Sequence, residues 1–438
     1  MSEFLRQRKF STRARVLAAP AGLAMAATAR LGGVARAQTP APSGTLRVAG
    51  NTSGQAETDI VNQVLNDFMA KYPTIKVTFE NISSDYFTKL QTDLAAGNAA
   101  DVFYLDSLPA PDLMAAGQLL ELDSYMSASG VKDSDFFPGL IKSYQLGGKT
   151  YGLPKDFSSL ASCYSTKAFS DAGIANAPTT WDELTSAAKT LKDKTGQPQI
   201  CIPIDLAREL AFHYQAGGKV ISDDGTKIVI DSPEAKTALD FYYGLYKDGL
   251  ASTPADIGAA WPGDALAKGL AALVFEGNWM FPFLAQSAPD LKVGIAELPK
   301  GPVEKADLAF TVAYCAFSGT KNPDAAWTLI NYLTGPDGMK KATDLGLAMP
   351  SRPELSAGWA QKFPERQSFI AAGPYSHGWQ FGPGGQAFYN DAQADFQGLF
   401  AGKLDTATTL QRWQKEAETR IRLTPGANPG ASPVATPA

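Results

Sequence analysis

The pattern of apolar and polar positions changes period several times in the first part of the chain, between the value of about 3.6 typical of helices and the value of 2 typical of strands. Residues 56–71 place Ile60, Val64 and Phe68 on one helical face, whereas residues 75–81 alternate like a half-buried strand. The full pattern predicts strand, helix, strand, helix and strand at residues 45–50, 56–71, 75–81, 85–96 and 101–105. This order is typical of a parallel sheet covered by helices.

Polar residues follow two of these expected strands. Asn51 and Ser53 lie in the loop after the first strand, and Asp106 comes directly after the third. Open α/β sheets bind ligands outside the carboxyl ends of their strands. We therefore expect these three side chains beside a ligand, with the alternative that Asp106 only caps the helix expected near Pro111.

Residues 147–184 contain two strand-type runs, one directly after the other. The first covers 150–153 and is expected to end at Pro154, because proline cannot donate a ladder hydrogen bond. The second covers 159–165. We interpret this pair as a strand that leaves one sheet and a strand that enters another, joined by an extended segment.

The remainder of the chain alternates again between the two periods. Thr180 is a good N-cap, with Glu183 three residues later as its capping-box partner. The later elements are expected at 167–172 (helix), 181–194 (helix), 199–204 (strand), 207–216 (helix), 217–231 (a hairpin about Asp224-Gly225), 233–247 (helix), 264–274 (helix), 323–334 (helix) and 403–421 (helix).

Length and composition indicate a globular protein of two domains. A chain of 438 residues is too long for one ordinary core, and 45% hydrophobic with 19% charged residues is typical of soluble proteins. Residues 1–37 are basic, and the rest of the chain holds 32 basic and 43 acidic residues, a net charge of −11. Such acidity argues against nucleic acid and against an anionic membrane surface as partners.

The first 37 residues are predicted to be a signal peptide, with a disordered basic tail as the alternative. Basic residues up to Arg15 precede an Ala-rich apolar run at 16–29, and Ala35-Arg36-Ala37 fits a cleavage site before Gln38. We expect an exported protein, periplasmic or extracellular, without a lipobox cysteine. Residues 38–43 are expected to form a linker, and the Pro/Ala/Gly-rich residues 423–438 a disordered tail.

Cysteine and histidine usage argues against a metal site. Cys163, Cys201 and Cys315 lie in apolar strand-type runs, which favours buried thiols, although one pair could oxidise in an exported protein. The two histidines, His213 and His377, form no zinc-type spacing. The chain also lacks the usual nucleophile-elbow, zinc-protease and phosphate-loop motifs. We therefore expect a binding protein that is not an enzyme and has no cofactor.

Several longer motifs recur along the chain in a fixed order. Between Gly148 and Leu184 the chain matches G-K-x-Y-G-L-P, then D, Y-N-K, A-G and P-x-T-W-x-E-L, with Ser165 in place of Asn. Residues 94–102 match L-x-x-G-x-x-P-D-V, with Ala100 in place of Pro. Further matches lie at 68–77, 116–122, 217–249, 264–279, 293–301, 323–334 and 349–352. Over about residues 45–422 the chain thus resembles the extracellular solute-binding proteins of ABC importers, in the sugar-binding, maltose-binding-protein-like family.

The resemblance implies an α/β fold with two lobes, the periplasmic-binding-protein fold, in which each lobe is a mostly parallel sheet flanked by helices. Residues 44–156 and 300–335 would form lobe one, and 157–299 and 336–422 lobe two. The implied partners are a mono- or oligosaccharide in the cleft between the lobes and the transmembrane permease subunits that read the closed form. The chain itself would be a monomer.

Side chains suited to a sugar are expected at this cleft. Aromatic rings cover the apolar face of a sugar, while carboxylates, amides and guanidinium groups bind its hydroxyls. The resemblance and the expected topology together give Asn51, Ser53, Asp106, Asp156, Trp261, Gly277, Asn278, Trp279, Arg352, Tyr375 and Trp379 as ligand-binding candidates. Structural roles are the alternatives: the hinge for Asp156 and Arg352, and the core for Trp261 and Trp379. Trp181 and Trp327 are expected in the core.

Other ligands and roles stay open at this point. The same fold could bind a polyamine or a phosphorylated polyol. An exported glycan-acting enzyme would need two carboxylates at catalytic separation in the cleft. A sensor that binds sugar without transport would have the same sequence features.

Overall fold

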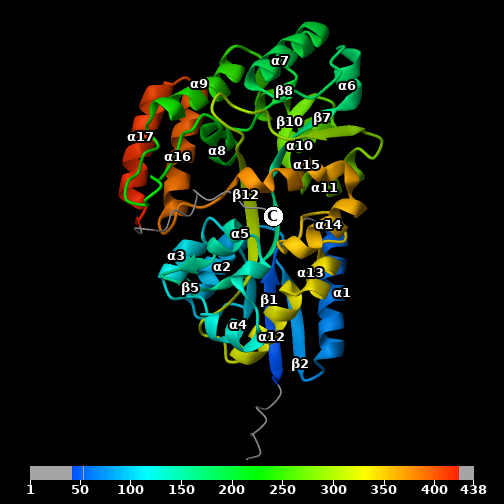
Figure 1. The fold of residues 1–438 in the computed structure, drawn as a ribbon, viewed down its shortest axis with the longest axis vertical. Helices are drawn as coiled ribbons and strands as arrows, with labels where there is room; N and C mark the ends of the chain where they lie inside the picture. Colours follow the sequence, from blue (N-terminus) through cyan, green and yellow to red (C-terminus); the bar gives the residue numbers. More distant parts are fainter. Residues whose placement is uncertain (1–41, 53, 424–438) are drawn as a thin grey trace, which may run out of the picture. The chain divides into compact units, whose positions relative to one another are not determined.

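The computed structural model describes residues 42–52 and 54–423. The expected signal peptide, most of the linker and tail, and the candidate Ser53 lie outside these residues. Within them the chain forms two large sheets flanked by helices and a small two-stranded sheet of β4 (Gln145–Leu146) and β5 (Lys149–Thr150) (Figure 1). The structure confirms the expected α/β class with two sheet-centred lobes.

The first sheet has the strand order β13-β12-β3-β1-β2, with β6 also paired to β12. The early strands run parallel, as their alternation with helices predicts, whereas β12 runs antiparallel to β3 and β6. The strands are β1 (Gly44–Gly50), β2 (Ile75–Asn81), β3 (Val102–Asp106), β6 (Gly152–Ser158), β12 (Asp307–Ala316) and β13 (Ser376–Gly378).

Helices cover both faces of this sheet because the strands carry apolar residues on both sides. Leu46, Val48 and Tyr104 pack with α1 and α12, whereas Phe103 and Leu105 pack with α2 and α3. The helices of this lobe are α1 (Gln55–Lys71), α2 (Tyr86–Ala95), α3 (Ala110–Ala115), α4 (Asp123–Ser129), α5 (Pro138–Lys142), α12 (Pro323–Thr334) and α13 (Pro336–Ala342).

The second sheet has the order β11-β7-β10-β8-β9, with β7 antiparallel to both of its neighbours. Its strands are β7 (Leu160–Ser165), β8 (Ile200–Cys201), β9 (Ala251–Ser252), β10 (Leu273–Gly277) and β11 (Val293–Ala296). The core on one side includes α7 (Trp181–Thr195), α8 (Leu206–Gln215), α9 (Pro233–Lys247), α16 (Gly385–Phe400) and α17 (Thr406–Arg420). On the other side lie α10 (Pro262–Ala267), α11 (Met280–Ser287), α14 (Pro353–Lys362) and α15 (Gln367–Ala371). The short helix α6 (Thr166–Asp171) follows β7.

Strand β12 belongs to the first sheet but also contacts the second lobe. Its last five residues pair with β3, while Leu308 near its start is buried in the core of the second lobe, and β12 packs on α8. In Figure 1 it runs lengthwise between the two groups of elements. The β6–β7 junction is a second link, and residues 343–349 are a third, since Met349 pairs with Phe157 of β6.

Three local predictions were wrong. Strand β6 continues through Pro154. The register with β12 shifts between Val312 and Ala313, which lets the ladder tolerate a residue that has no N–H to donate. The helix expected at 264–274 is the short α10 followed by β10, whose residues are all buried. Glu183 accepts from the backbone and hydroxyl of Thr179, both at 2.7 Å, instead of from Thr180, although Thr180 does cap α7.

Two further differences concern element length and placement. The hairpin expected at 217–231 is reduced to a single bridge between Ile221 and Ile228. Helix α13, expected in lobe two, packs instead on α1 and α12, with Met339 buried in the core of the first lobe.

Candidate functional site

One face of β12 brings side chains of both lobes together. Val312 is paired with Asp106 of β3 on one side and with Asp156 of β6 on the other. Directly paired residues point to the same face of a sheet, so the two carboxyl groups flank Val312, across two strand spacings of about 4.8 Å each. Phe310, two residues earlier, points to that face as well. On this face a set of side chains around Asp106 and Asp156, the acidic group, therefore lies next to a set of rings around Phe310, the aromatic group.

Of the two acids in the acidic group, Asp106 is the one without a partner. It ends β3, is exposed, and forms no hydrogen bond or ion pair within the described part of the chain. Its pKa is nevertheless raised to about 6, because the surrounding protein displaces much of the solvent around the carboxyl and because Asp156 adds a second negative charge. Lys155 opposes this shift only in part. Asp106 is thus an accessible hydrogen-bond acceptor.

Lys155 and Asp156 form an ion pair at the edge of the same group. Each side chain is only 15% exposed, and the Lys155 ammonium lies 5.0 Å from the centre of the Tyr104 ring. Burial disfavours the ammonium charge, but Asp156 and Glu57 raise the pKa of Lys155 above its usual value. The pair borders a cavity of about 30 Å³, which is large enough for a water molecule and too small for a sugar.

The second lobe contributes a network of charges around Arg208 of α8. This guanidinium donates to both carboxylate oxygens of Glu276, at 3.1 and 3.0 Å, and to Asp205 at 3.1 Å. The Glu276 side chain is 1% exposed, so it is buried against its ion-pair partner Arg208. Asp205 caps α8 through the backbone of Ala207. The positive charge of Arg208 is therefore already matched within the protein.

Aromatic rings surround this network. The Trp279 indole donates to Glu276 at 3.0 Å, and its ring meets Phe310 edge-on with centroids 5.4 Å apart. Arg208 lies 5.5 Å from the Trp279 ring centre. Gly277 permits this arrangement, because a Cβ there would come within 2.2 Å of the Trp279 ring.

Two further rings extend the wall toward the C-terminal helices. Trp379 lies 6.1 Å from Phe310 and 5.4 Å from Tyr389, whose hydroxyl donates to Asp205 at 3.3 Å. Trp379 also links the two groups, because its backbone carbonyl accepts from Ser107, the residue after Asp106, at 2.8 Å. The acidic and aromatic groups thus border one another.

The comparisons with known proteins agree with this architecture. The family described as bacterial extracellular solute-binding protein matches residues 52–340, about two thirds of the chain. The chain belongs to this family. A Brucella abortus protein whose name says only that it binds is 26% identical over 369 residues, which cover 82% of this solute-binding protein and 89% of the relative.

Two sugar-associated proteins are also similar to this solute-binding protein. A diacetylchitobiose binding protein from Streptomyces coelicolor is 29% identical over 236 residues, covering 52% of this chain and 53% of the relative. The structure of an ABC transporter solute binding protein from Thermotoga lettingae, bound with α-D-tagatose, has a TM-score of 0.77 at 25% identity and covers 87% of this chain and 100% of its own. No helix within residues 42–52 and 54–423 is long and apolar enough to span a membrane.

The structure brings three of the predicted residues of this solute-binding protein to the shared face, and others near it. Asp106, Asp156 and Trp279 belong to the two groups, with Gly277 under the Trp279 ring. Trp379 adjoins Phe310 but is only 8% exposed within the core of the second lobe, which favours the structural role left open for it. Asn51 is exposed in the loop after β1. Asn278 is fully buried, and its amide donates to the Gly346 carbonyl, so it acts within the protein.

Three other predicted residues make contacts with residues outside these groups. Trp261 packs edge-on against Phe283 at 5.1 Å. Arg352 is 6% exposed and donates to the Thr334 carbonyl at 2.6 Å, and the Tyr375 hydroxyl donates to Glu297 at 2.5 Å. These contacts favour the structural roles that the sequence left open for Trp261 and Arg352.

Sequence reasoning missed Asp205, Arg208, Glu276, Phe310 and Tyr389. The rule that ligands lie at strand ends applied equally to the second sheet, where it would have indicated Asp205 after β8 and Glu276 near the end of β10. No comparable signal marks Tyr389, because it lies on an amphipathic helix far from any strand end.

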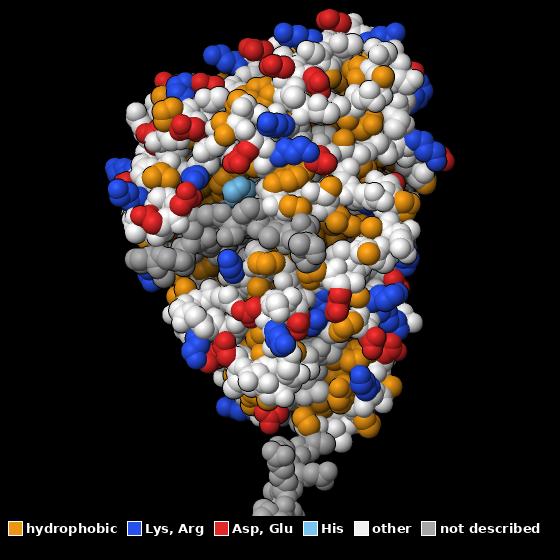
Figure 2. Space-filling model, in the orientation of Figure 1, with side chains coloured by type: hydrophobic (Ala, Val, Ile, Leu, Met, Phe, Trp, Pro, Cys, Tyr) orange, Lys and Arg blue, Asp and Glu red, His pale blue; other side chains and the backbone are white. Residues whose placement is uncertain are grey.

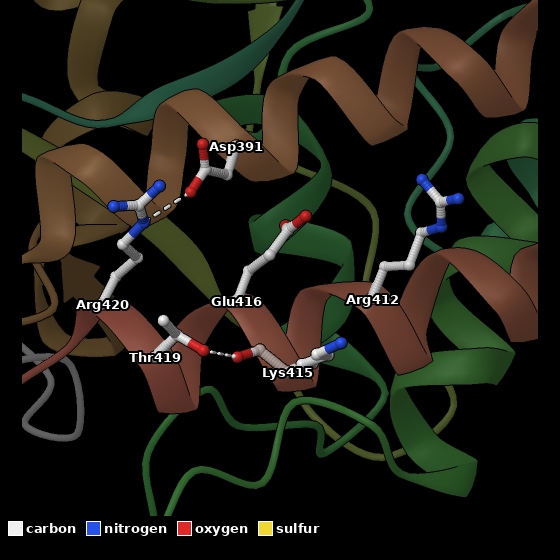
Figure 3. A pocket seen from close by; sticks show the side chains of 6 residues that line it. All are labelled: Asp391, Arg412, Lys415, Glu416, Thr419 and Arg420. Atoms are coloured by element: carbon white, nitrogen blue, oxygen red, sulfur yellow. Dashed lines mark hydrogen bonds and ion pairs between the residues drawn. The ribbon is translucent and has the colours of Figure 1, made fainter.

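A second cavity, between α16 and α17, has a volume of about 360 Å³. Figure 3 shows that its walls are five charged side chains and Thr419, with Arg420 paired to Asp391. Arg412 pairs with Asp395 at 2.8 Å, and burial beside Asp395 raises the pKa of Glu416 to about 7. Because both arginines are held by neighbouring carboxylates and no aromatic ring lines it, this cavity fits a sugar less well than the face of β12.

Charge on the molecular surface gives no other candidate on the face that Figure 2 shows. Lys and Arg side chains alternate there with Asp and Glu, without a patch of one sign. That mixture is consistent with the acidic net charge and with a ligand held by local contacts.

Proposed function

We propose that this protein captures an uncharged mono- or oligosaccharide in a cleft beside β12 and delivers it to the permease of an ABC importer. The observation that carries the proposal is the shared face of β12, where exposed Asp106 is paired with Val312 and the Trp279 ring packs on Phe310, two residues earlier on the same strand. The rings would cover the apolar face of a pyranose, and the carboxylates would accept from its hydroxyls.

The charges of the two groups support a neutral ligand over an anionic one. Lys155 is paired with Asp156, and Arg208 with Glu276 and Asp205. A phosphorylated polyol would need one of these cations to exchange its buried carboxylate for a phosphate, which leaves that carboxylate unpaired at a large cost. Unpaired Asp106 would tolerate a cation, so a polyamine is the ligand class most worth testing beside sugars.

Ligand binding would shift the protein toward a closed form that contacts the ligand from both lobes. The crossings at the β6–β7 junction, at the start of β12 and at 343–349 are where we place the lobe boundary. Closure about these three segments would form the surface that the permease recognises, and the chain would act as a monomer in this step.

A thermal-shift screen of residues 38–438 tests the proposal. The panel holds mono- and oligosaccharides, polyols, glycerol phosphates, polyamines and ferric ion, and a ligand at a hundred times its Kd stabilises the native state by about 2.7 kcal/mol. We expect a shift with at least one neutral sugar, lost in Trp279→Ala and reduced in Asp106→Asn. Trp261→Ala is the matched control, because it removes a half-buried tryptophan that lies outside the two groups.

The other outcomes would replace the proposal. A response to polyamines alone would keep the fold and change the ligand. A response to glycerol phosphates alone would contradict the charge argument. Release of reducing sugar from a glycan would indicate an enzyme that uses the two carboxylates. Loss of binding in Trp261→Ala but not in Trp279→Ala would move the site away from β12.

A further inference from the structure

One backbone carbonyl in the third crossing is held by two side chains of lobe two. The carbonyl of Gly346 accepts from the amide of Asn278 and from the guanidinium of Arg366. Asn278 directly precedes Trp279, and Arg366 directly precedes α15. The segment 343–349 is thereby fastened to the same loop that presents the Trp279 ring.

Arg366 is built into this position. Its guanidinium carbon lies 4.6 Å from the centre of the Phe281 ring and 4.8 Å from that of Phe363, so the cation is held between two aromatic faces. The side chain is 14% exposed, and Glu365 pairs with it at 3.1 Å. A guanidinium in this setting has little rotational freedom, which fixes the direction of its bond to Gly346.

Gly346 is fitted to both partners. Its φ of +67° lies in the left-handed region, and a Cβ would come within 2.5 Å of the Arg366 guanidinium and 2.6 Å of the Phe363 ring. Lys362 supports the same turn by donating to the Asp344 carbonyl at 2.7 Å. The turn therefore has one well-defined conformation.

The other end of the segment reaches the acidic group. Met349 and Phe157 exchange backbone hydrogen bonds at 2.9 and 3.0 Å, so the segment pairs with the part of β6 that follows Lys155 and Asp156. Thr343, Leu347 and Ala348 line the small cavity beside the Lys155–Asp156 pair. Asn278 also donates from its backbone to Ser158, the last residue of β6, at 2.8 Å.

We propose that Arg366 and Asn278 are positioning residues of the ligand cleft, which act through the Gly346 carbonyl. They hold segment 343–349 against β6. The wall next to Lys155 and Asp156 thereby keeps a fixed position relative to the loop that carries Trp279. We call the hydrogen bonds of Arg366 and Asn278 to the Gly346 carbonyl the clamp. The inference rests on the proposed function only in naming the cleft, because the clamp is present in the ligand-free protein.

Hydrogen exchange on the ligand-free protein tests the clamp directly. Arg366→Met keeps an apolar stem between the two rings but removes the donor. We expect exchange of the peptide 343–349 and of the peptide 152–158 to rise at least tenfold, with helix α12 unchanged. Asn278→Asp, which keeps the shape and loses the amide donor, should act in the same direction. Arg366→Lys retains a cation and a donor and should restore most of the protection.

Arg412→Met is the matched control, since it removes an ion-paired arginine from α17 and should leave both peptides as they are. Equal exchange of 343–349 in Arg366→Met and the wild type would overturn the proposal. So would a uniform rise in every peptide, α12 included, because that result marks Arg366 as a residue of general stability.

The affinity measurement separates this proposal from the function. For a sugar that the wild type binds, Arg366→Met should raise Kd about tenfold and Arg366→Lys should recover it. A loosened segment with unchanged affinity would refute the positioning role while leaving the proposed function intact. If the wild type bound no sugar, the proposed function would fall, and the exchange data would still decide whether the clamp exists.

Discussion

Asp106 offers the sharpest test of how the cleft holds its ligand. The carboxyl is exposed and without a partner among the described residues, and its pKa is raised to about 6 from 3.8. Only the ionised form can accept hydrogen bonds from hydroxyls with both oxygens. At pH 5, one unit below this pKa, about a tenth of the protein has an ionised Asp106. Affinity for a neutral sugar should therefore fall roughly tenfold between pH 8 and pH 5.

The sign follows from proton linkage. Binding to the ionised form lowers the pKa of Asp106, so the protein should release a proton on binding near pH 6, and affinity should rise with pH until the carboxyl is fully ionised. Isothermal titration at pH 5, 6, 7 and 8, in two buffers of different ionisation enthalpy, measures both quantities. A neutral sugar does not itself titrate in this range, so the dependence belongs to the protein.

Asp106→Asn provides the control. It should bind roughly twofold to thirtyfold more weakly at pH 8 for each hydrogen bond concerned, because hydrogen bonds to a charged acceptor contribute about 1.5–3 kcal/mol and those to a neutral one about 1 kcal/mol. Its affinity should be flat between pH 5 and pH 8. A wild-type affinity that does not change over this range, or a variant that keeps the wild-type slope, would refute the assignment of Asp106 to the ligand.

Three further predictions address the rest of the molecule. Burial raises the pKa of Glu209 to about 8 from 4.5, so the folded state holds an extra proton between these pH values and the free energy of unfolding falls as pH rises through them. Glu209→Gln should remove this loss, which is on the order of 4 kcal/mol. In urea melts, the stability of the variant relative to the wild type should therefore increase from pH 5 to pH 9. Gly277→Ala should displace the Trp279 ring and weaken sugar binding at least tenfold, and wild-type affinity would contradict the packing that we describe. Cys163 and Cys201 are paired with Val274 from the strands on its two sides, so their Cα atoms are about 10 Å apart and beyond disulfide reach. Because all three cysteines are buried, their thiols should react with a thiol reagent only after unfolding, and a native disulfide would disprove this geometry.

Most of the fold could be predicted because local signals and tertiary packing agree. Residues 75–81, 233–247 and 323–334 form the elements that their periodicity indicates, with the expected bounds. The helix predicted at 264–274 was wrong because its Ala and Leu residues fit a helix as well as a strand. Pairing with the neighbouring strands β7 and β8 stabilises the strand there. Pro154 misled because a register shift in a distant strand accommodates it.

The candidate site was predictable where a ligand-type residue ends an expected strand or lies in a motif of the family. Asp106 ends β3, whereas Trp279 was expected only from the resemblance, because the strand β10 before it was taken for part of a helix. Tyr389 and Arg208 lie on helices, and only the three-dimensional packing brings them to Phe310 or Asp205. Buried partners also decide which polar residues are available. Arg352 suits a sugar by its chemistry, but the Thr334 carbonyl already occupies it.

The place of β12 in the chain has a consequence for biosynthesis. All strands of the second sheet lie between residues 160 and 296, whereas β3 and β6 of the first sheet meet only through β12, at 307–316. A growing chain therefore carries two unpaired strand edges until roughly three quarters of it has been made, and such edges favour aggregation. The pairing of Val312 with Asp106 also closes a loop of about 200 residues, a separation that slows folding. The N-terminal lobe should thus be the last to reach its native form, and holding the chain unfolded until it is complete would protect it.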